Sequence, residues 1–257
     1  MSGSKSYQIL SAEDGSPAAV VNSRGKGPIC LVCEHASAVI PAGLGSLGLA
    51  EEDRFSHAVW DIGAELVARD LSRKLDAPLV VATVSRLVYD LNRPPTAPGA
   101  MPSKSGAIQV PENLNLSDDD RALRASEVYE PFHAKVSEVL DGFGTPPAFV
   151  TIHSFTPTWD GKNRETQLGL LHDADPRLAM AMMAISDDTL VTRLNEPYSA
   201  RDGVTHMLKR HAIARGLQNV MIELRNDLLT REGDVARISS LLAGMLTASL
   251  DLQPESA

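Results

Sequence analysis

Two histidines and a glutamate of this chain stand at the ends of short apolar runs. His35 follows one such run, His153 ends a second, and Glu223 lies near the end of a third. Neutral imidazole is a common zinc ligand, and a catalytic zinc takes three protein ligands and keeps one position open. A carboxylate near such an ion can accept a proton from water. The sequence therefore predicts a hydrolytic metal site with His35 and His153 as ligands and Glu223 as the general base.

The third ligand of the predicted site is a carboxylate, and the sequence offers two candidates for it. Asp61 stands on what the apolar spacing predicts to be a helical face that is otherwise apolar. Glu34 is the alternative, although neighbouring residues of a strand point to opposite faces, which would turn Glu34 away from His35. We therefore expect His35, Asp61 and His153 to bind Zn²⁺, with one ion in each chain.

Three arginines near the strand ends indicate that the substrate carries a negative charge. Arg86 and Arg93 follow one apolar run, and Arg225 follows another. A guanidinium group can hold a carboxylate through two parallel hydrogen bonds. The expected substrate is therefore a small anionic molecule, and Ser154, directly after His153, is a further candidate contact.

Short apolar runs bounded by glycine or proline predict the buried strands that carry these residues. Such runs occupy residues 29–33, 79–84, 148–153, 167–171 and 220–224. Helical spacing of apolar residues predicts helices between them, at residues 51–75, 117–140, 176–185, 203–216 and 234–250. Strands that alternate with helices are typical of a three-layer α/β/α fold with a mostly parallel central sheet. Ligands of such sheets bind beyond the carboxyl ends of the strands, which is where the candidate residues stand.

The composition is that of a soluble globular protein, and it limits the classes of partner. The chain has 257 residues, of which 43% are hydrophobic, and we expect one α/β domain over residues 1–257 with its core at about 25–250. A net charge of −9 argues against a nucleic-acid partner. The sequence shows no signal peptide and no apolar run of membrane length, which predicts a cytoplasmic protein without membrane contact. The sequence leaves open whether the protein forms a homo-oligomer. Cys30 and Cys33 are expected to be buried structural thiols.

Five segments of the chain resemble the N-formylglutamate amidohydrolase family, which is itself similar in fold to the zinc carboxypeptidases. They are CEHAS (33–37), WDIGA (60–64), SRLVYDLNR (85–93), IHSF (152–155) and IELRNDL (222–228), in the order of the family. The resemblance implies a phosphorylase/hydrolase-like fold and zinc-dependent hydrolysis of the amide bond of an N-formyl or N-acyl acidic amino acid. From N-formyl-L-glutamate, the products would be formate and glutamate. The resemblance also implies zinc at His35 and His153 and a general base at Glu223. It further implies that Asn92 and Arg93 bind the carboxylate of the substrate.

The chain departs from the related patterns at two places. The zinc carboxypeptidases carry a glutamate three residues after the first histidine ligand, and this chain has Ala38 there. The resemblance therefore leaves the third ligand to Asp61 or Glu34. Members with the named activity tend to have Pro-His-Ser-Gly where this chain has EHAS (34–37). We expect the metal and the reaction type to carry over more fully than the preference for formylglutamate.

Two other functions stay open on the sequence alone. One is a small zinc peptidase or deacylase with another substrate, and the other is a non-catalytic module that binds a carboxylate. Tyr89, Arg201, His206 and His211 are candidates for shaping the pocket, although His206 and His211 suit solvent-facing or structural positions on their helix better. Nucleotide binding is disfavoured, because the segment GLGSLG (43–48) does not directly follow a predicted strand.

Overall fold

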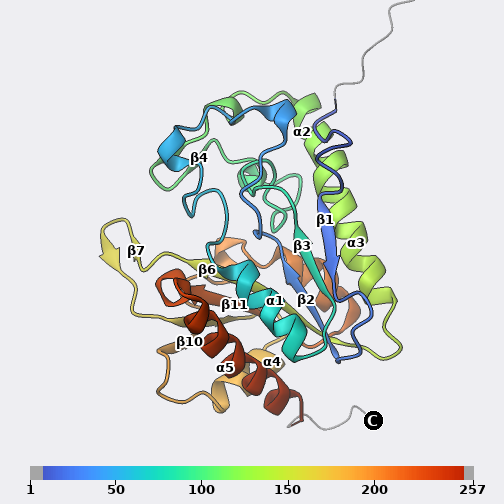
Figure 1. The fold of residues 1–257 in the computed structure, drawn as a ribbon, viewed down its shortest axis with the longest axis vertical. Coiled ribbons are helices and arrows are strands. Elements are labelled where there is room, and N and C mark those ends of the chain that lie inside the picture. Colours follow the sequence, from blue (N-terminus) through green and yellow to red (C-terminus); the bar gives the residue numbers. More distant parts are fainter. Residues whose placement is uncertain (1–7, 252–257) are drawn as a thin grey trace, which may run out of the picture.

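The computed structural model describes residues 8–251, and a seven-stranded sheet runs through its centre (Figure 1). The strand order is β1-β3-β2-β6-β11-β9-β10. Four of the six neighbouring pairs are parallel, and the pairs β1–β3 and β9–β11 are antiparallel. The strands are β1 (Ala18–Val21), β2 (Ile29–Cys33), β3 (Leu79–Ala82), β6 (Ala148–Phe155), β9 (Leu168–Leu171), β10 (Thr192–Leu194) and β11 (Asn219–Arg225).

All five strands predicted from apolar runs are present, and β1 and β10 were not predicted. The five correspond to β2, β3, β6, β9 and β11, whose side chains are buried along almost their whole length. The two additional strands form the edges of the sheet. An edge strand is partly exposed, as β1 and β10 are, so its apolar pattern is weaker than that of a central strand.

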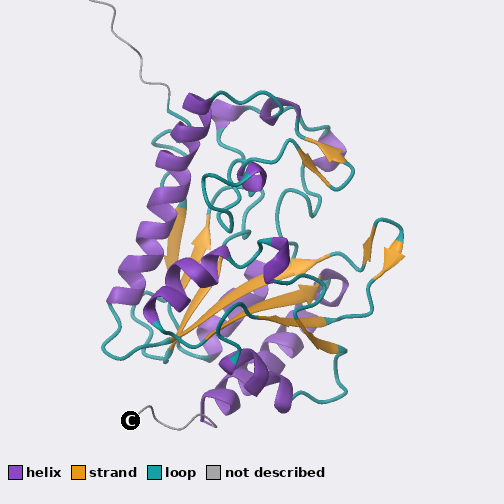
Figure 2. Cartoon of the chain, turned by 180° about the vertical axis from the view of Figure 1, so that it is seen from behind, coloured by secondary structure: helices purple, strands orange, loops and turns teal. Residues whose placement is uncertain are grey.

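Helices cover both faces of the sheet and give the molecule three layers (Figure 2). On one face lie α1 (Ala64–Lys74), α4 (Arg177–Ala184) and α5 (Glu232–Asp251). On the other face lie α3 (Glu130–Asp141) and the π-helical turn η7 (Leu208–Ala212). The predicted three-layer α/β/α fold with a mostly parallel sheet is thus confirmed.

Each face of the sheet has its own hydrophobic core, because successive side chains of a strand point to opposite faces. In β2, Cys30 and Val32 belong to the core beneath α3, whereas Leu31 and Cys33 belong to the core beneath α1 and α5. Both thiols are free and buried, as expected. Burial raises the pKa of the Cys30 thiol to about 12.

The predicted helix at residues 51–75 is wrong over its first half. Glu51–Asp53 form only a short 3₁₀ turn, η2, and α1 begins at Ala64. Gly63 precedes α1 with a φ of +82°, and a Cβ at this position would lie 2.7 Å from the Cβ of Leu229. This left-handed, tightly packed residue separates α1 from what comes before it. Asp61 therefore lies in the loop before α1 and not on the helical face that the sequence predicted.

The predicted helix at residues 117–140 is confirmed in extent, but it is not regular. It consists of α2 (Asp118–Arg124), a π-helical turn η5 (Ala125–Tyr129) and α3. Pro131 in the first turn of α3 has no N–H to donate, which fits the wider turn before it.

In the predicted helix 203–216, η7 is followed by the 3₁₀ turn η8 (Ile213–Arg215). No helix within residues 8–251 is long and apolar enough to cross a membrane.

Two small hairpins project from the same side of the molecule, beyond the sheet (Figure 1). One pairs β4 (Lys104–Ser105) with β5 (Ile108–Gln109), between the predicted strand 79–84 and the predicted helix 117–140, where no strand was predicted. The other pairs β7 (Thr158–Trp159) with β8 (Lys162–Asn163). Because β7 follows β6 closely in the chain, the second hairpin begins near His153.

Candidate active site

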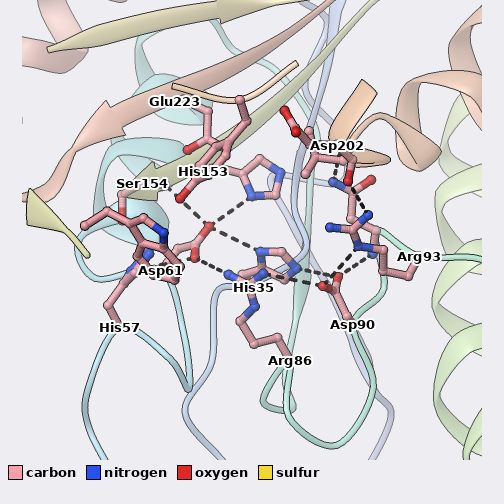
Figure 3. Close-up of a pocket in the computed structure, with 14 residues that line it drawn as sticks. His35, His57, Asp61, Arg86, Asp90, Arg93, His153, Ser154, Asp202 and Glu223 are labelled. Atoms are coloured by element: carbon pink, nitrogen blue, oxygen red, sulfur yellow. Dashed lines mark hydrogen bonds and ion pairs between the residues drawn. The ribbon is translucent and has the colours of Figure 1, made fainter. Parts of the chain in front are cut away.

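The structure brings His35, Asp61 and His153 together (Figure 3). One ligand atom of each lies within 4.8 Å of the others, and the residues are 3%, 1% and 2% exposed, respectively. Since β2 and β6 are parallel neighbours, His35 just past β2 and His153 near the end of β6 meet at the carboxyl edge of the sheet. The Asp61 N–H donates to the His35 carbonyl oxygen at 2.9 Å, which fixes the loop before α1 beside the two imidazoles.

Each imidazole of the cluster lies between two carboxylates. The Nδ1 atoms of His35 and His153 lie 3.3 Å and 2.9 Å from the same oxygen, Oδ2 of Asp61. On the other side of each ring, His35 Nε2 lies 2.8 Å from Asp90 Oδ1, and His153 Nε2 lies 3.2 Å from Glu34 Oε2. Glu34 contacts the Nε2 side of His153 and belongs neither to the His35–Asp61–His153 cluster nor to the residues that line the cavity, so Asp61 and not Glu34 is the carboxylate that lies between the two Nδ1 atoms.

This arrangement fits a bound cation. When the proton of each imidazole is on Nε2, where it faces Asp90 or Glu34, both Nδ1 atoms carry a lone pair and face an oxygen of Asp61, which is also an acceptor. Such acceptors repel one another unless a positive charge lies between them. Ligands bound at about 2.0–2.2 Å around one zinc ion are separated by little more than 3 Å. The two Nδ1 atoms lie 3.3 Å and 2.9 Å from Asp61 Oδ2, so a small outward shift of His153 would complete this spacing. Metal-binding histidines also commonly donate their second N–H to a carboxylate.

The electrostatics of the cluster favour a positive charge at its centre. Burial lowers the pKa of His153, but Glu34 and Asp61 outweigh burial and raise that pKa well above its ordinary value. Burial raises the pKa of Asp61, but His35 and His153 outweigh this and hold that pKa well below its usual range. The carboxylates thus favour positive charge on the imidazoles, and the imidazoles favour the ionised form of Asp61. A divalent ion at the same place would supply the positive charge in their stead.

Glu223 lies beside His153, because the parallel pairing of β11 with β6 aligns these two residues. It is buried and lines the same cavity as the cluster. Its Oε2 atom makes no hydrogen bond with any of the residues 8–251, and burial raises its pKa to about 7. A carboxylate with a free oxygen and a pKa near neutrality can accept a proton from water and release it again.

Arg86 joins two carboxylates of the site. Its Nη1 donates to Asp61 Oδ1 at 3.0 Å, and its Nη2 donates to Asp90 Oδ2 at 3.4 Å. Since Asp90 also contacts His35, Arg86 orients both sides of the first imidazole. The predicted contact of Arg86 with a substrate stays a prediction. Asp90 was not singled out from the sequence, although it stands inside the SRLVYDLNR segment.

Arg93 and Asn92 lie at one end of the cavity. The Arg93 Nη1 donates to the carbonyl oxygen of Asp202 at 2.8 Å. Both polar atoms of the Asn92 side chain are engaged, because Nδ2 donates to the Val204 carbonyl and Oδ1 accepts from the Met207 N–H. Asn92 thus ties its loop to the helical segment before η7, and Arg93 is the member of the pair that presents a charged group to the cavity.

Ser154 lines the cavity, whereas Arg225 lies outside it. The Ser154 Oγ donates to the Ile62 carbonyl at 2.8 Å and so steadies the loop before α1. Arg225 donates from Nε to Asp227 at 2.8 Å and from Nη1 to the Arg164 carbonyl at 2.9 Å. These contacts brace the chain after β11, so the predicted role of Arg225 at the substrate gains no support from its position.

The four candidates for shaping the pocket do not line it. Tyr89 is fully buried, and Arg201 is exposed. His206 and His211 belong to a polar cluster beside α3, in which His206 Nε2 contacts the Tyr129 hydroxyl at 2.8 Å and His211 Nε2 lies 2.7 Å from an imidazole nitrogen of α3. The structural interpretation of these two histidines therefore agrees with where they lie.

The cavity has a volume of about 320 Å³, and several residues that line it were not singled out from the sequence. His57 Nδ1 lies 3.9 Å from Asp61 Oδ1, and burial lowers the pKa of His57 to about 4, so the ring is neutral near pH 7. His57 stands four residues before Asp61, which is the one sequence signal that could have drawn attention to it. Trp159 and Tyr198 reach the cavity only through the tertiary fold, and a single sequence carries no signal for them.

A buried His–Asp–His cluster and a free glutamate, held beyond the carboxyl ends of a mostly parallel sheet, define an α/β enzyme whose site is suited to hydrolysis. The similarity to known proteins agrees with this class. Residues 27–230 match the family described as N-formylglutamate amidohydrolase. The chain belongs to this family and is an amidohydrolase.

Three relatives illustrate the match. An N-formylglutamate deformylase from Pseudomonas aeruginosa is 25% identical over 199 residues, which cover 72% of this chain and 71% of that protein. The crystal structure of a gene product of Agrobacterium tumefaciens is 47% identical, has a TM-score of 0.93 and covers 95% of this chain and 98% of its own. An N-formylglutamate amidohydrolase from Ralstonia eutropha shares the fold, with a TM-score of 0.69, 17% identity and coverage of 92% and 98%.

Proposed function

We propose that the protein hydrolyses N-formyl-L-glutamate to formate and glutamate, with a zinc ion held by His35, Asp61 and His153. Membership of the family supports this substrate. One observation carries the proposal of a metal: both Nδ1 atoms face the same Asp61 oxygen, while both Nε2 atoms face other carboxylates. Such a ring of acceptors is stable around a cation.

Zinc at such a site supplies a Lewis acid, which polarises a carbonyl oxygen and lowers the pKa of water. Glu223 accepts a proton from the attacking water and passes it to the leaving nitrogen, so that a C–O bond forms and the C–N bond breaks. Asp90 accepts a hydrogen bond from His35 Nε2–H and so favours the tautomer that leaves Nδ1 free, and the Glu34 carboxylate, 3.2 Å from His153 Nε2, favours the same tautomer of the second imidazole electrostatically. Arg93 binds the carboxylate of the substrate.

The test is to measure zinc content and the release of glutamate on the same purified protein, before and after treatment with a chelator. We expect about one zinc per chain and a release of glutamate that the chelator abolishes. His153→Gln should lose zinc, whereas the matched variant His172→Gln, which lies away from the site, should keep it. Zinc without release of glutamate would reject the substrate, and failure to bind added zinc would reject the metal site.

A further inference from the structure

A second cavity, of about 820 Å³, adjoins the active-site cavity and lies between the two hairpins. One wall comes from residues 104–108 of the β4–β5 hairpin, and another comes from residues 158–161 of the β7–β8 hairpin. His57, Arg86, Trp159 and Tyr198 line both cavities. The two spaces therefore meet at the end of the active site where these four residues lie.

At His57, the boundary between the two cavities lies across the cluster from the proposed carboxylate contact. In Figure 3, His57 and Arg93 stand on opposite sides of the His35–Asp61–His153 cluster. If Arg93 binds the carboxylate on the amino-acid half of the substrate, the acyl half points across the cluster toward His57. The second cavity is then available to the acyl group and not to the amino acid.

A formyl group needs almost none of this room. It carries only a hydrogen atom beyond its carbonyl carbon, whereas pockets for whole ligands measure about 300–1,000 Å³. The active-site cavity alone, of about 320 Å³, is in that range. Formylglutamate therefore does not need the second cavity, whereas a substrate with a larger acyl group could place that group in it.

The boundary between the two cavities offers a fixed aromatic surface. Trp159 is 49% exposed and lies under the Arg164 guanidinium, with 5.3 Å between the guanidinium carbon and the indole centre. The same guanidinium lies 5.0 Å from the ring centre of Tyr198 and donates to its hydroxyl at 3.1 Å. From the other hairpin, Gly106 approaches so closely that a Cβ there would lie 3.4 Å from the indole.

These contacts hold the indole in place while leaving much of it uncovered. Ile108 and Ala107 add apolar side chains to the wall of the same cavity. A rigid, exposed aromatic face is a good surface for stacking a flat apolar group.

We propose that this enzyme accepts N-acylated acidic amino acids whose acyl group is larger than formyl, flat and apolar, and that this group occupies the cavity between the hairpins against Trp159. The inference rests on the proposed function, since it uses the same scissile bond and the same general base. Water adds to the acyl carbon, the C–N bond breaks, and an aromatic carboxylate and the free amino acid leave.

The test compares kcat/KM for N-formyl-, N-benzoyl- and N-phenylacetyl-L-glutamate on the zinc-loaded protein. We expect a higher kcat/KM for at least one of the two aromatic substrates than for the formyl substrate. Ile108→Trp fills the second cavity and should lower kcat/KM for the aromatic substrates, relative to the formyl substrate, by about 10-fold. Leu66→Trp adds the same side chain on the outer surface of α1 and should change neither value.

The outcomes separate this inference from the proposed function. If formylglutamate is the best substrate, or if Ile108→Trp affects all substrates equally, the inference is overturned while the proposed function stands. If an aromatic substrate is hydrolysed and formylglutamate is not, the inference stands and formylglutamate is rejected as the substrate. If none of them is hydrolysed, both are overturned.

Discussion

A carboxylate lies behind each imidazole of the proposed metal site, and Asp90 behind His35 makes the closer contact. Asp90 contacts His35 Nε2 at 2.8 Å and also engages Arg86, so one acid links the imidazole to a half-buried guanidinium. Replacement by the isosteric amide keeps the shape but removes the charge. Asp90→Asn should therefore lower zinc affinity by about 10–100-fold, which competition with a chelator of known affinity would measure. Asp175→Asn, which breaks a surface ion pair with Arg177, is the control and should leave the affinity unchanged.

For Glu223 we expect a loss of catalysis and not of zinc, because this residue has no expected role in holding the metal. Glu223→Gln cannot accept a proton from water, so kcat should fall by about 10²–10⁴-fold while zinc content stays the same. Single-turnover and steady-state rates with N-formyl-L-glutamate would measure the loss. Glu232→Gln at the start of α5 serves as the control. A variant that retained its kcat would show that another group is the base.

The chemical role of single residues could be predicted from the sequence where those residues lie at the ends of strands. His35, His153 and Glu223 each follow or end an apolar run, and the sheet brings such positions to one edge. Asp61 was predicted as a neighbour of the histidines on the wrong grounds, since it lies in a loop and not on a helix. Trp159 and Tyr198 could not be predicted, because their positions depend on a hairpin and a loop with no apolar pattern.

At the scale of elements, the short turn η6 (Ala200–Asp202) supports Arg93 through its C-terminal glycine. Gly203 has a φ of +69°, and a Cβ there would lie 2.7 Å from Arg93 Nη1. Gly203→Ala should therefore displace the guanidinium and raise KM for formylglutamate, while zinc content stays the same.

Gly216 is a matched control for this substitution. It also follows a 3₁₀ turn with a φ of +69°, but no atom of the described residues lies within 4 Å of a Cβ built there. Both alanine variants carry a similar backbone strain, of about 1–2 kcal/mol. Equal KM values in the two variants would contradict the placement of Arg93 at the substrate carboxylate.

Central elements could be predicted from the sequence more fully than peripheral ones. The strand β2 was predicted with its observed bounds, because five consecutive apolar residues between breakers have few alternatives. The helix expected at 51–75 failed because apolar residues such as Phe55, which is exposed, happened to continue the helical spacing before Gly63. Short hairpins such as β4–β5 depend on contacts that no local pattern records.

At the scale of the whole molecule, buried histidines beside α3 make stability depend on pH. Burial lowers the pKa of His133 to about 2 and that of His211 to about 3, and Arg210 and His206 act in the same direction. In the unfolded chain both groups titrate near about 6.5. Below that pH the unfolded chain binds protons that the folded chain does not, so the free energy of unfolding falls as pH decreases. Each ring contributes a slope of up to about 1.4 kcal/mol per pH unit.

Urea unfolding of the metal-free protein and of His211→Gln, between about pH 7 and pH 5, would measure this dependence. The variant should show a shallower fall of the unfolding free energy, because one of the two rings no longer titrates. The histidines of the proposed metal site are present in both proteins, so their contribution cancels in the comparison. Equal slopes would mean that His211 is protonated in the folded protein.

The alternation of side chains along β2 gives this protein one thiol in each of its two cores, Cys30 beneath α3 and Cys33 beneath α1 and α5. A buried thiol reacts with an alkylating reagent only while the structure around it is open. The modification rate of Cys30 therefore reports how often one layer of helices detaches, and that of Cys33 reports the other. Two cysteines three residues apart on a single strand thus report whether the two helical layers open together or one at a time.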